Sequence, residues 1–180
     1  GLERGIPDSG ASGCVLSPAF AKRWDGACDQ RVLYHGFDQN QRWGVGGGLI
    51  VVAMQDSTGV WRRRTWGQGY VVAQAKDTLL SIPAAQRFGM GAEFLPAGGA
   101  NMTDVYGRRY PMVKPVGSGT YRLDMYMMSS RDAHEDGCIV DVAKRGPEAR
   151  WSVGAASEDT MVGMIDAAVG GELPWKGEHG

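Results

Sequence analysis

The sequence lacks several features that would place it in a common class. No apolar run approaches the roughly 20 residues that a membrane-spanning helix needs, and the longest, LIVVAM at 49–54, suits a buried strand. There is no basic excess, because 19 Lys and Arg stand against 20 Asp and Glu, for a formal net charge of −1. Proteins that neutralise phosphates usually carry such an excess, so we do not expect nucleic acid as the partner. We also expect no membrane span and no signal peptide.

Cysteine is scarce, and its count leaves the redox state open. The three cysteines are Cys14, Cys28 and Cys138, and an odd number argues against a complete disulfide framework. Either Cys14 and Cys28 pair across a short loop and leave Cys138 free, or all three are reduced thiols. The compartment stays equally open between an extracellular or virion setting and the cytoplasm.

Glycine and tryptophan are abundant, with 28 and 6 residues, which is typical of tight turns around sheets filled by aromatic side chains. From residue 31 to 151 the dominant hydrophobic period is two, which predicts strands. Between them, residues 96–119 are rich in Gly and Pro and predict long ordered loops. The predicted strands are 31–37, 44–55, 60–74, 105–110, 120–128, 138–143 and 149–153.

The clearest helix signals lie near the two ends of the chain, and one helical turn is also predicted over residues 83–88. Residues 1–13 predict an extended N-terminal arm, and Ser17-Pro18 then opens a short helix, because Ser caps a helix well and Pro suits its first position. Near the other end, apolar residues at helical spacing predict an amphipathic helix over 157–169. No linker or internal repeat interrupts the chain, so we expect one domain over residues 1–180.

The segment GSGTYRLDM at 117–125 resembles a central strand of jelly-roll domains, a group that includes carbohydrate-binding modules and many viral coat proteins. The resemblance covers about a fifth of the chain and concerns architecture alone. Together with the period of two, it leads us to expect a mainly β fold. We predict an antiparallel, jelly-roll-like β-sandwich with short helices near the N- and C-termini.

Arginine and tryptophan gather in WRRRTW at 61–66. On a strand, Arg62, Arg64 and Trp66 share one face, and Trp61 lies on the other. Arg and Trp dominate the energetics of protein interfaces, although a charged edge strand that blocks aggregation has the same pattern. We therefore hypothesise that these four residues bind a partner. Trp43 and Trp175 are two further candidate binding residues, the latter in the C-terminal tail.

Two short motifs resemble those of ADP-ribosyltransferases of the diphtheria-toxin and poly-ADP-ribose-polymerase class. They are LYHG at 33–36 and GQGY at 67–70. The resemblance implies that His35 would hold a ribose hydroxyl of NAD and that Tyr70 would stack on the nicotinamide. It makes His35 and Tyr70 the candidate catalytic residues, with NAD as the cofactor, of an alternative enzymatic function.

A third alternative is a carbohydrate-binding module. The segment QNQRW at 39–43 is similar to the Gln-x-Trp element of ricin-type sugar-binding repeats. Trp43, Trp61 or Trp66 would then supply a stacking platform for a sugar ring. The acidic stretch near His134 has metal-capable side chains but no recognised ligand spacing, so we predict no metal site.

No complete catalytic constellation is present, and this decides the leading hypothesis. We expect a non-enzymatic binding or assembly protein, either a coat or decoration subunit or a surface recognition module. Long ordered loops and an extended arm would suit contacts between subunits, so we expect protein partners and a homo-oligomer. Under this hypothesis the chain needs no cofactor.

Overall fold

The computed structural model describes residues 2–22, 24, 31–35, 41–129 and 135–142, with the backbone alone at 31–35, 41 and 42. In this part of the chain the fold is mainly β, as the sequence predicts, with one short helix near the N-terminus and a second in mid-chain. The predicted helix at 157–169 and Trp175 lie outside the described residues. In chain order the elements are β1 (Glu3–Asp8), β2 (Cys14–Leu16), α1 (Pro18–Ala21), β3 (Arg31–His35), β4 (Gln41–Gln55), β5 (Trp61–Val72), β6 (Leu79–Ser81), α2 (Ile82–Gln86), β7 (Met90–Phe94), β8 (Ala100–Asp104), β9 (Arg109–Pro111) and β10 (Leu123–Met128).

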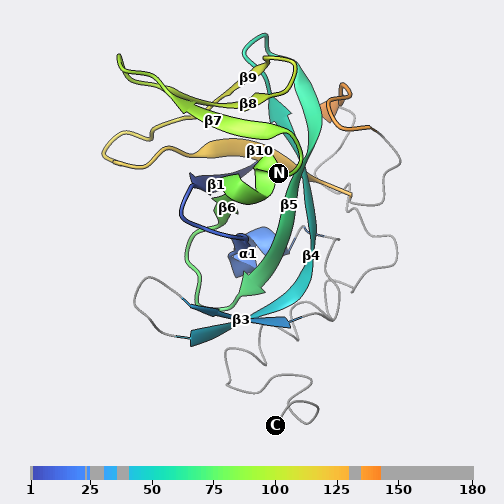
Figure 1. The fold of residues 1–180 in the computed structure, drawn as a ribbon, viewed down its shortest axis with the longest axis vertical. Helices are drawn as coiled ribbons and strands as arrows, with labels where there is room; N and C mark the ends of the chain where they lie inside the picture. The colour runs from blue at the N-terminus through green and yellow to red at the C-terminus, as the bar shows by residue number, and fades with distance from the viewer. Residues whose placement is uncertain (1, 23, 25–30, 36–40, 130–134, 143–180) are drawn as a thin grey trace.

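Six strands close into a barrel (Figure 1). Their order is β10-β1-β6-β2-β5-β4, and the ring closes because β10 also pairs with β4, where Met125 lies opposite Met54. Two neighbouring pairs, β1–β6 and β2–β5, are parallel, and the others are antiparallel. The predicted antiparallel sandwich is therefore not confirmed. Closure pairs both edges of the sheet, whereas a sandwich leaves edges exposed.

The predicted N-terminal arm is extended, but its strand belongs to the barrel. β1 lies between β10 and β6, with Gly5 opposite Leu123 and Ile6 opposite Leu79. Backbone pairing on both sides is how a central strand satisfies its polar groups. These contacts tie the start of the chain to strands more than 70 residues away.

From Ile50 to Met54 the apolar run of β4 is buried on both faces, as predicted for a continuous hydrophobic stretch, whereas Leu49 at its start is exposed. Ile50 and Val52 point into the barrel, whereas Val51 and Ala53 point outward. The segment 135–142 covers that outer face, where Val140 packs in the same cluster. Of the strand predicted at 138–143, the described residues form only an isolated bridge between Ile139 and Arg62.

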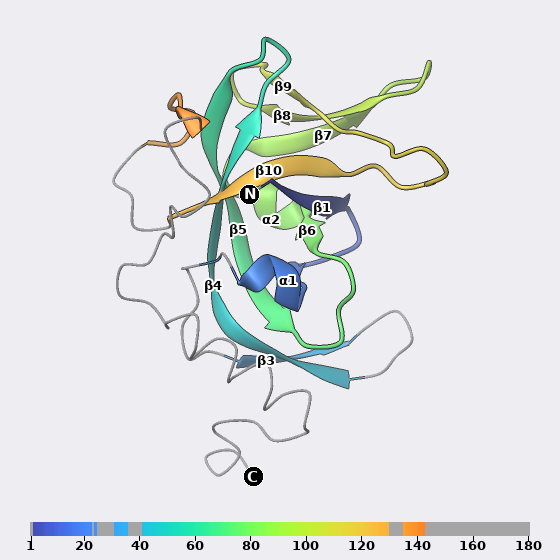
Figure 2. The same cartoon turned by 180° about the vertical axis from the view of Figure 1, so that it is seen from behind.

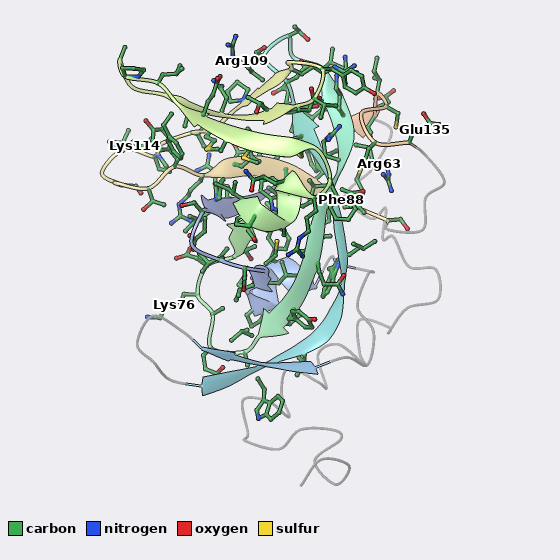
Figure 3. The ribbon with its side chains drawn as sticks, in the orientation of Figure 1. Arg63, Lys76, Phe88, Arg109, Lys114 and Glu135 are labelled. Carbon is green, nitrogen blue, oxygen red and sulfur yellow. The ribbon has the colours of Figure 1, made fainter. Side chains whose placement is uncertain are left out.

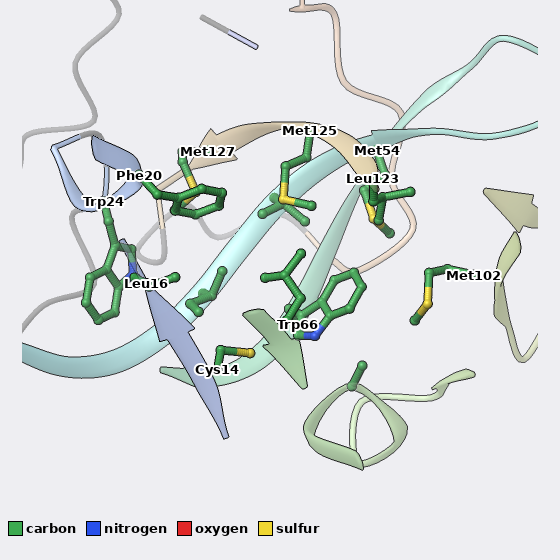
Figure 4. Close-up of a cluster of buried hydrophobic side chains, with 14 of the residues drawn as sticks. Cys14, Leu16, Phe20, Trp24, Met54, Trp66, Met102, Leu123, Met125 and Met127 are labelled. Carbon is green, nitrogen blue, oxygen red and sulfur yellow. The ribbon is translucent and has the colours of Figure 1, made fainter. Parts of the chain in front are cut away.

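Large side chains from most strands fill the barrel, so its interior is a packed core (Figure 4). Trp66 of β5 is fully buried there, and its indole Nε1 donates a 2.8 Å hydrogen bond to the carbonyl of Ser81. The core residues labelled in Figure 4 are Cys14, Leu16, Phe20, Trp24, Met54, Trp66, Met102, Leu123, Met125 and Met127.

Both helices are single turns that begin with a serine cap followed by proline. Ser17 Oγ accepts from Phe20 N at the start of α1, as predicted, and Ser81 Oγ accepts from Ala84 N at the start of α2. Figure 2 shows both helices beside β5. Where α2 meets β5, Gly67 has a φ of +142° and a Cβ at this position would lie 2.9 Å from that of Ala84. Only glycine combines this backbone with so close an approach.

The second sheet, β7-β8-β9, packs one face on the barrel, over β10 in the view of Figure 1. Met90, Met102 and Tyr110 contribute this face to the common core. On the opposite face Glu93 accepts from Asn101 (2.9 Å) and Arg109 (2.7 Å), which links the three strands. These bonds hold the pKa of Glu93 below its ordinary value. No helix among the described residues is long and apolar enough to cross a membrane.

Candidate interaction surface

The three consecutive arginines of β5 are each paired with a different aspartate. Arg62 Nε lies 2.9 Å from Asp56 Oδ2, and Arg63 Nη1 lies 2.6 Å from Asp136 Oδ1. The Arg64 guanidinium is almost fully buried and makes a 3.9 Å ion pair with Asp104. The aspartates come from the turn after β4, the segment 135–142 and the end of β8. The arginines therefore join these segments to β5 and do not form an open cationic face.

Arg64 and Asp104 belong to a buried polar group where the second sheet meets the barrel. Arg64 Nη2 also donates to the carbonyl of Phe88, and the Tyr110 hydroxyl donates to Asp104 Oδ2 at 3.0 Å. Burial would raise the pKa of Asp104, but the hydrogen bonds from Tyr110 and two backbone amides hold it below the ordinary value. Burial and this carboxylate together raise the pKa of Tyr110 to about 12. Ionised Asp104 and neutral Tyr110 are the forms that fit the contact at neutral pH.

The tryptophans proposed to bind a partner occupy three different environments. Trp66 lies in the core, and Trp61 is half-buried with its ring edge-on to Tyr126, 4.9 Å between centroids. Trp43 is exposed, but it lies near the start of β4, whereas Trp61 pairs with the last residue of that strand, Gln55. The structure does not bring these residues together as a sugar platform. As buried groups, Trp66 and Arg64 offer no surface to a partner in this conformation.

The register of the sheet also separates the two candidate catalytic residues. Val71 of β5 pairs with Val45 of β4, which pairs in turn with Arg31 of β3. Tyr70 lies one position before this row and His35 four positions beyond it, or roughly 16 Å apart along the strands at the usual rise per residue. The two positions do not line a single nicotinamide–ribose site.

In the acidic stretch considered for metal binding, Asp136 is hydrogen-bonded to side chains and backbone of β5. Asp136 Oδ1 accepts a hydrogen bond from Arg63 Nη1. It accepts two more, both of 2.9 Å, from the backbone amide and the hydroxyl of Thr65. Within the described segments, no group of three or more His, Cys, Asp or Glu side chains is arranged to hold a metal ion. His134 lies outside the described residues.

Among the described residues, four of the eleven large exposed apolar side chains lie on two loops that project from the same side of the molecule (Figures 1 and 2). One is the β7–β8 hairpin, where Phe94 is 61% exposed and Leu95 45%. The other joins β9 to β10 and carries Val113 and the fully exposed Val116. We call these four residues the tip surface. Lys114, labelled in Figure 3, lies on the same loop.

Specific contacts fix the tip surface in place. The ring of Phe94 lies 6.0 Å from that of Tyr121, and the Tyr121 hydroxyl accepts a 3.0 Å hydrogen bond from the amide of Gly99. These two contacts join the hairpin to the long loop. Val113 and Arg122 close the base of that loop with two backbone hydrogen bonds of 2.7 Å.

A tight turn holds Val116 in the solvent. The amide of Ser118 bonds to the carbonyl of Pro115 at 2.9 Å, and Gly117 has a φ of +79°. In this four-residue turn Pro115 is at the first position and Gly117, with its positive φ, is at the third. Val116, at the second position, therefore lies at the outer corner of the turn. The loop is therefore ordered before any partner arrives.

The loops predicted over 96–119 contain β8 and β9, and most of the strand predicted at 105–110 is the turn between them. The tip residues were not predicted from the sequence. The signal was present, because Phe94 and Leu95 precede Pro96, and Val116 lies between Pro115 and Gly117. Apolar side chains beside turn-forming residues cannot all point into a core, since turns lie at the surface.

Searches with protein-family models, curated proteins and solved structures found no match to this chain.

Proposed function

We propose that this chain is a non-enzymatic protein-binding or assembly domain and that the tip surface is its docking site. The observation that carries the proposal is the exposure of Phe94, Leu95, Val113 and Val116 on two loops held together by Tyr121. Exposed apolar side chains in water favour burial against a partner. A coat or decoration subunit and a recognition module both use such a surface.

Rigidity supports the proposal as much as exposure does. Binding orders side chains and loops at a free-energy cost, and a loop that is already ordered avoids much of that cost. The Pro115–Ser118 turn and the Val113–Arg122 pairing supply this order. An exposed aromatic side chain such as Phe94 also has a large apolar area to bury against a partner.

The charges favour a protein partner over nucleic acid. Arg62, Arg63 and Arg64 are each taken up by an aspartate, and the chain as a whole carries a formal charge of −1. Affinity for nucleic acid depends mainly on cations free to contact phosphates. This function does not depend on whether the fold is the predicted jelly-roll, because the proposed docking site lies on loops.

Gel filtration of an extract from cells that produce the protein tests the proposal. The wild-type chain should elute in a complex larger than its 19.3 kDa monomer. Val116→Asp places a charge at the tip and should release the monomer. The matched control is Gln68→Asp on the exposed side of β5, which should leave the complex intact. Monomeric elution of the wild-type chain, or a complex that both variants retain, would count against the tip surface.

A further inference from the structure

The buried guanidinium of Arg64 has few partners for its hydrogen-bond donors. A guanidinium carries several N–H donors, but within the described part of the chain that of Arg64 makes a single hydrogen bond, from Nη2 to the carbonyl of Phe88 at 3.2 Å. Its Nε is buried without a partner there, and its Nη1 lies 3.9 Å from Asp104 Oδ2, too far for a hydrogen bond. Because a buried donor without a partner costs free energy, this side chain is suited to a further acceptor.

A second guanidinium, that of Arg108, approaches the same place. A Cβ added to Gly137 would lie 3.2 Å from Arg108 Nη1 and 3.5 Å from Arg64 Nη1. The two nitrogen atoms therefore face one position beside the Gly137 Cα, close enough for one small anion to contact both. Gly137 has no side chain to fill this position, and its φ of +87° is one that other residues rarely adopt.

The charges of these side chains do not balance. Arg64 and Arg108 share the carboxylate of Asp104, whose Oδ2 lies 3.9 Å from Arg64 Nη1 and 3.4 Å from Arg108 Nη1. The other two arginines of β5 each have an aspartate of their own. Two positive charges thus meet one negative charge, although the Arg64 side chain is only 3% exposed and that of Arg108 31%. Buried charge is costly unless it is neutralised, and one monovalent anion would complete the balance.

We propose that a small monovalent anion of the size of chloride binds between Arg64 and Arg108 beside Gly137. The site is separate from the tip surface and does not depend on the proposed function. Its residues come from β5 of the barrel, from the β8–β9 turn of the second sheet and from the segment 135–142. A bound anion would therefore join three parts of the fold, and the stability of the chain should depend on chloride.

Broadening of the chloride NMR line measures this binding on the folded chain. The wild-type protein should broaden the line, and a chloride titration gives the dissociation constant. Arg108→Gln removes one of the two guanidiniums and should weaken binding by about tenfold or more, the scale of a hydrogen bond to a charged group. The matched control is Arg109→Gln, which makes the same charge change at the neighbouring, more exposed arginine that pairs with Glu93. It should bind chloride as the wild type does, and circular dichroism checks that both variants are folded.

Urea unfolding provides an independent measurement. Stability is compared in sodium chloride and in sodium gluconate at equal ionic strength, because the bulky gluconate anion does not fit between two nearly buried side chains. Chloride at about ten times its dissociation constant should raise the ratio of folded to unfolded chains roughly elevenfold over gluconate. Arg108→Gln should lose most of this gain, whereas Arg109→Gln should keep it.

Three results would overturn the anion site. They are a chloride line that the wild-type chain does not broaden, a broadening that Arg108→Gln retains in full, and a stability that is the same in chloride and in gluconate. The second result would mean that chloride binds elsewhere on the chain.

Discussion

The Tyr110 hydroxyl donates a 3.0 Å hydrogen bond to Asp104, and the same carboxylate faces the buried guanidinium of Arg64 at 3.9 Å. Asp104 also accepts hydrogen bonds from the backbone amides of Tyr106 and Arg108. One carboxylate therefore joins the second sheet to the barrel and shapes the β8–β9 turn.

Asp104→Asn should lower the free energy of unfolding by about 3 kcal/mol, because it leaves Arg64 buried without its counter-charge. Urea unfolding measures this loss. The matched control is Asp77→Asn, which removes the more exposed pair with Arg122 and should cost no more than about 1 kcal/mol. Equal losses in the two variants would show that the buried pair has no special role.

The Asp56 side chain gives the stability a predictable dependence on pH. Burial raises its pKa, but hydrogen bonds from Thr58, Arg62 and Val60 outweigh that effect and lower it from 3.8 to about 2. A carboxyl whose pKa is depressed by folding stabilises the fold above its unfolded pKa and loses this contribution as the pH falls towards the folded value. The stability difference between wild type and Asp56→Asn should therefore hold above pH 4 and shrink between about pH 4 and 2. A constant difference over that window would contradict the assignment.

Gly67→Ala should destabilise the chain by about 1–3 kcal/mol, because φ is +142° and the added Cβ would meet Ala84 at 2.9 Å. Gly119→Ala is the control, since a Cβ there meets nothing within 4 Å. Thermal unfolding compares the two variants. A neutral Gly67→Ala would mean that α2 does not press on β5 as described.

Cys14 should resist alkylation in the folded chain. Burial raises the pKa of its thiol to about 12, so almost no thiolate exists at pH 8, and the side chain is 1% exposed. Mass spectrometry of iodoacetamide-treated protein should find Cys14 unmodified until denaturant is added. Rapid modification in native buffer would indicate that the barrel opens near β2.

The sequence predicts the longest strands well and the closure of the barrel poorly. β4, β5 and β10 carry continuous or alternating apolar residues that identify them. β7 and β8 were missed because Gly91 and Asn101 interrupt their pattern, and because Gly98 and Gly99 between them indicate a loop. Closure depends on the pairing of β10 with β4, some 70 residues apart, which no local pattern encodes.

For the candidate site, too, the sequence pattern does not predict contacts between residues far apart in the chain. The alternation of side chains along a strand correctly predicts that Arg62, Arg64 and Trp66 share one face of β5. It does not predict whether that face points to the core or to solvent. Arg64 finds its aspartate 40 residues along the chain, at Asp104. A run of arginines looks the same in sequence whether its partners are solvent or buried aspartates. The proposed interaction surface rests instead on exposed apolar residues beside turn-forming residues.

Photo-crosslinking tests the central claim, docking at the tip surface, most directly. p-Benzoylphenylalanine replaces Val116 in one chain and Gln68 in a control chain, and both are irradiated in cells that produce the protein. The account predicts a discrete adduct with a protein partner from position 116 alone. The same adduct yield from position 68, or no adduct from position 116, would contradict docking at the tip surface.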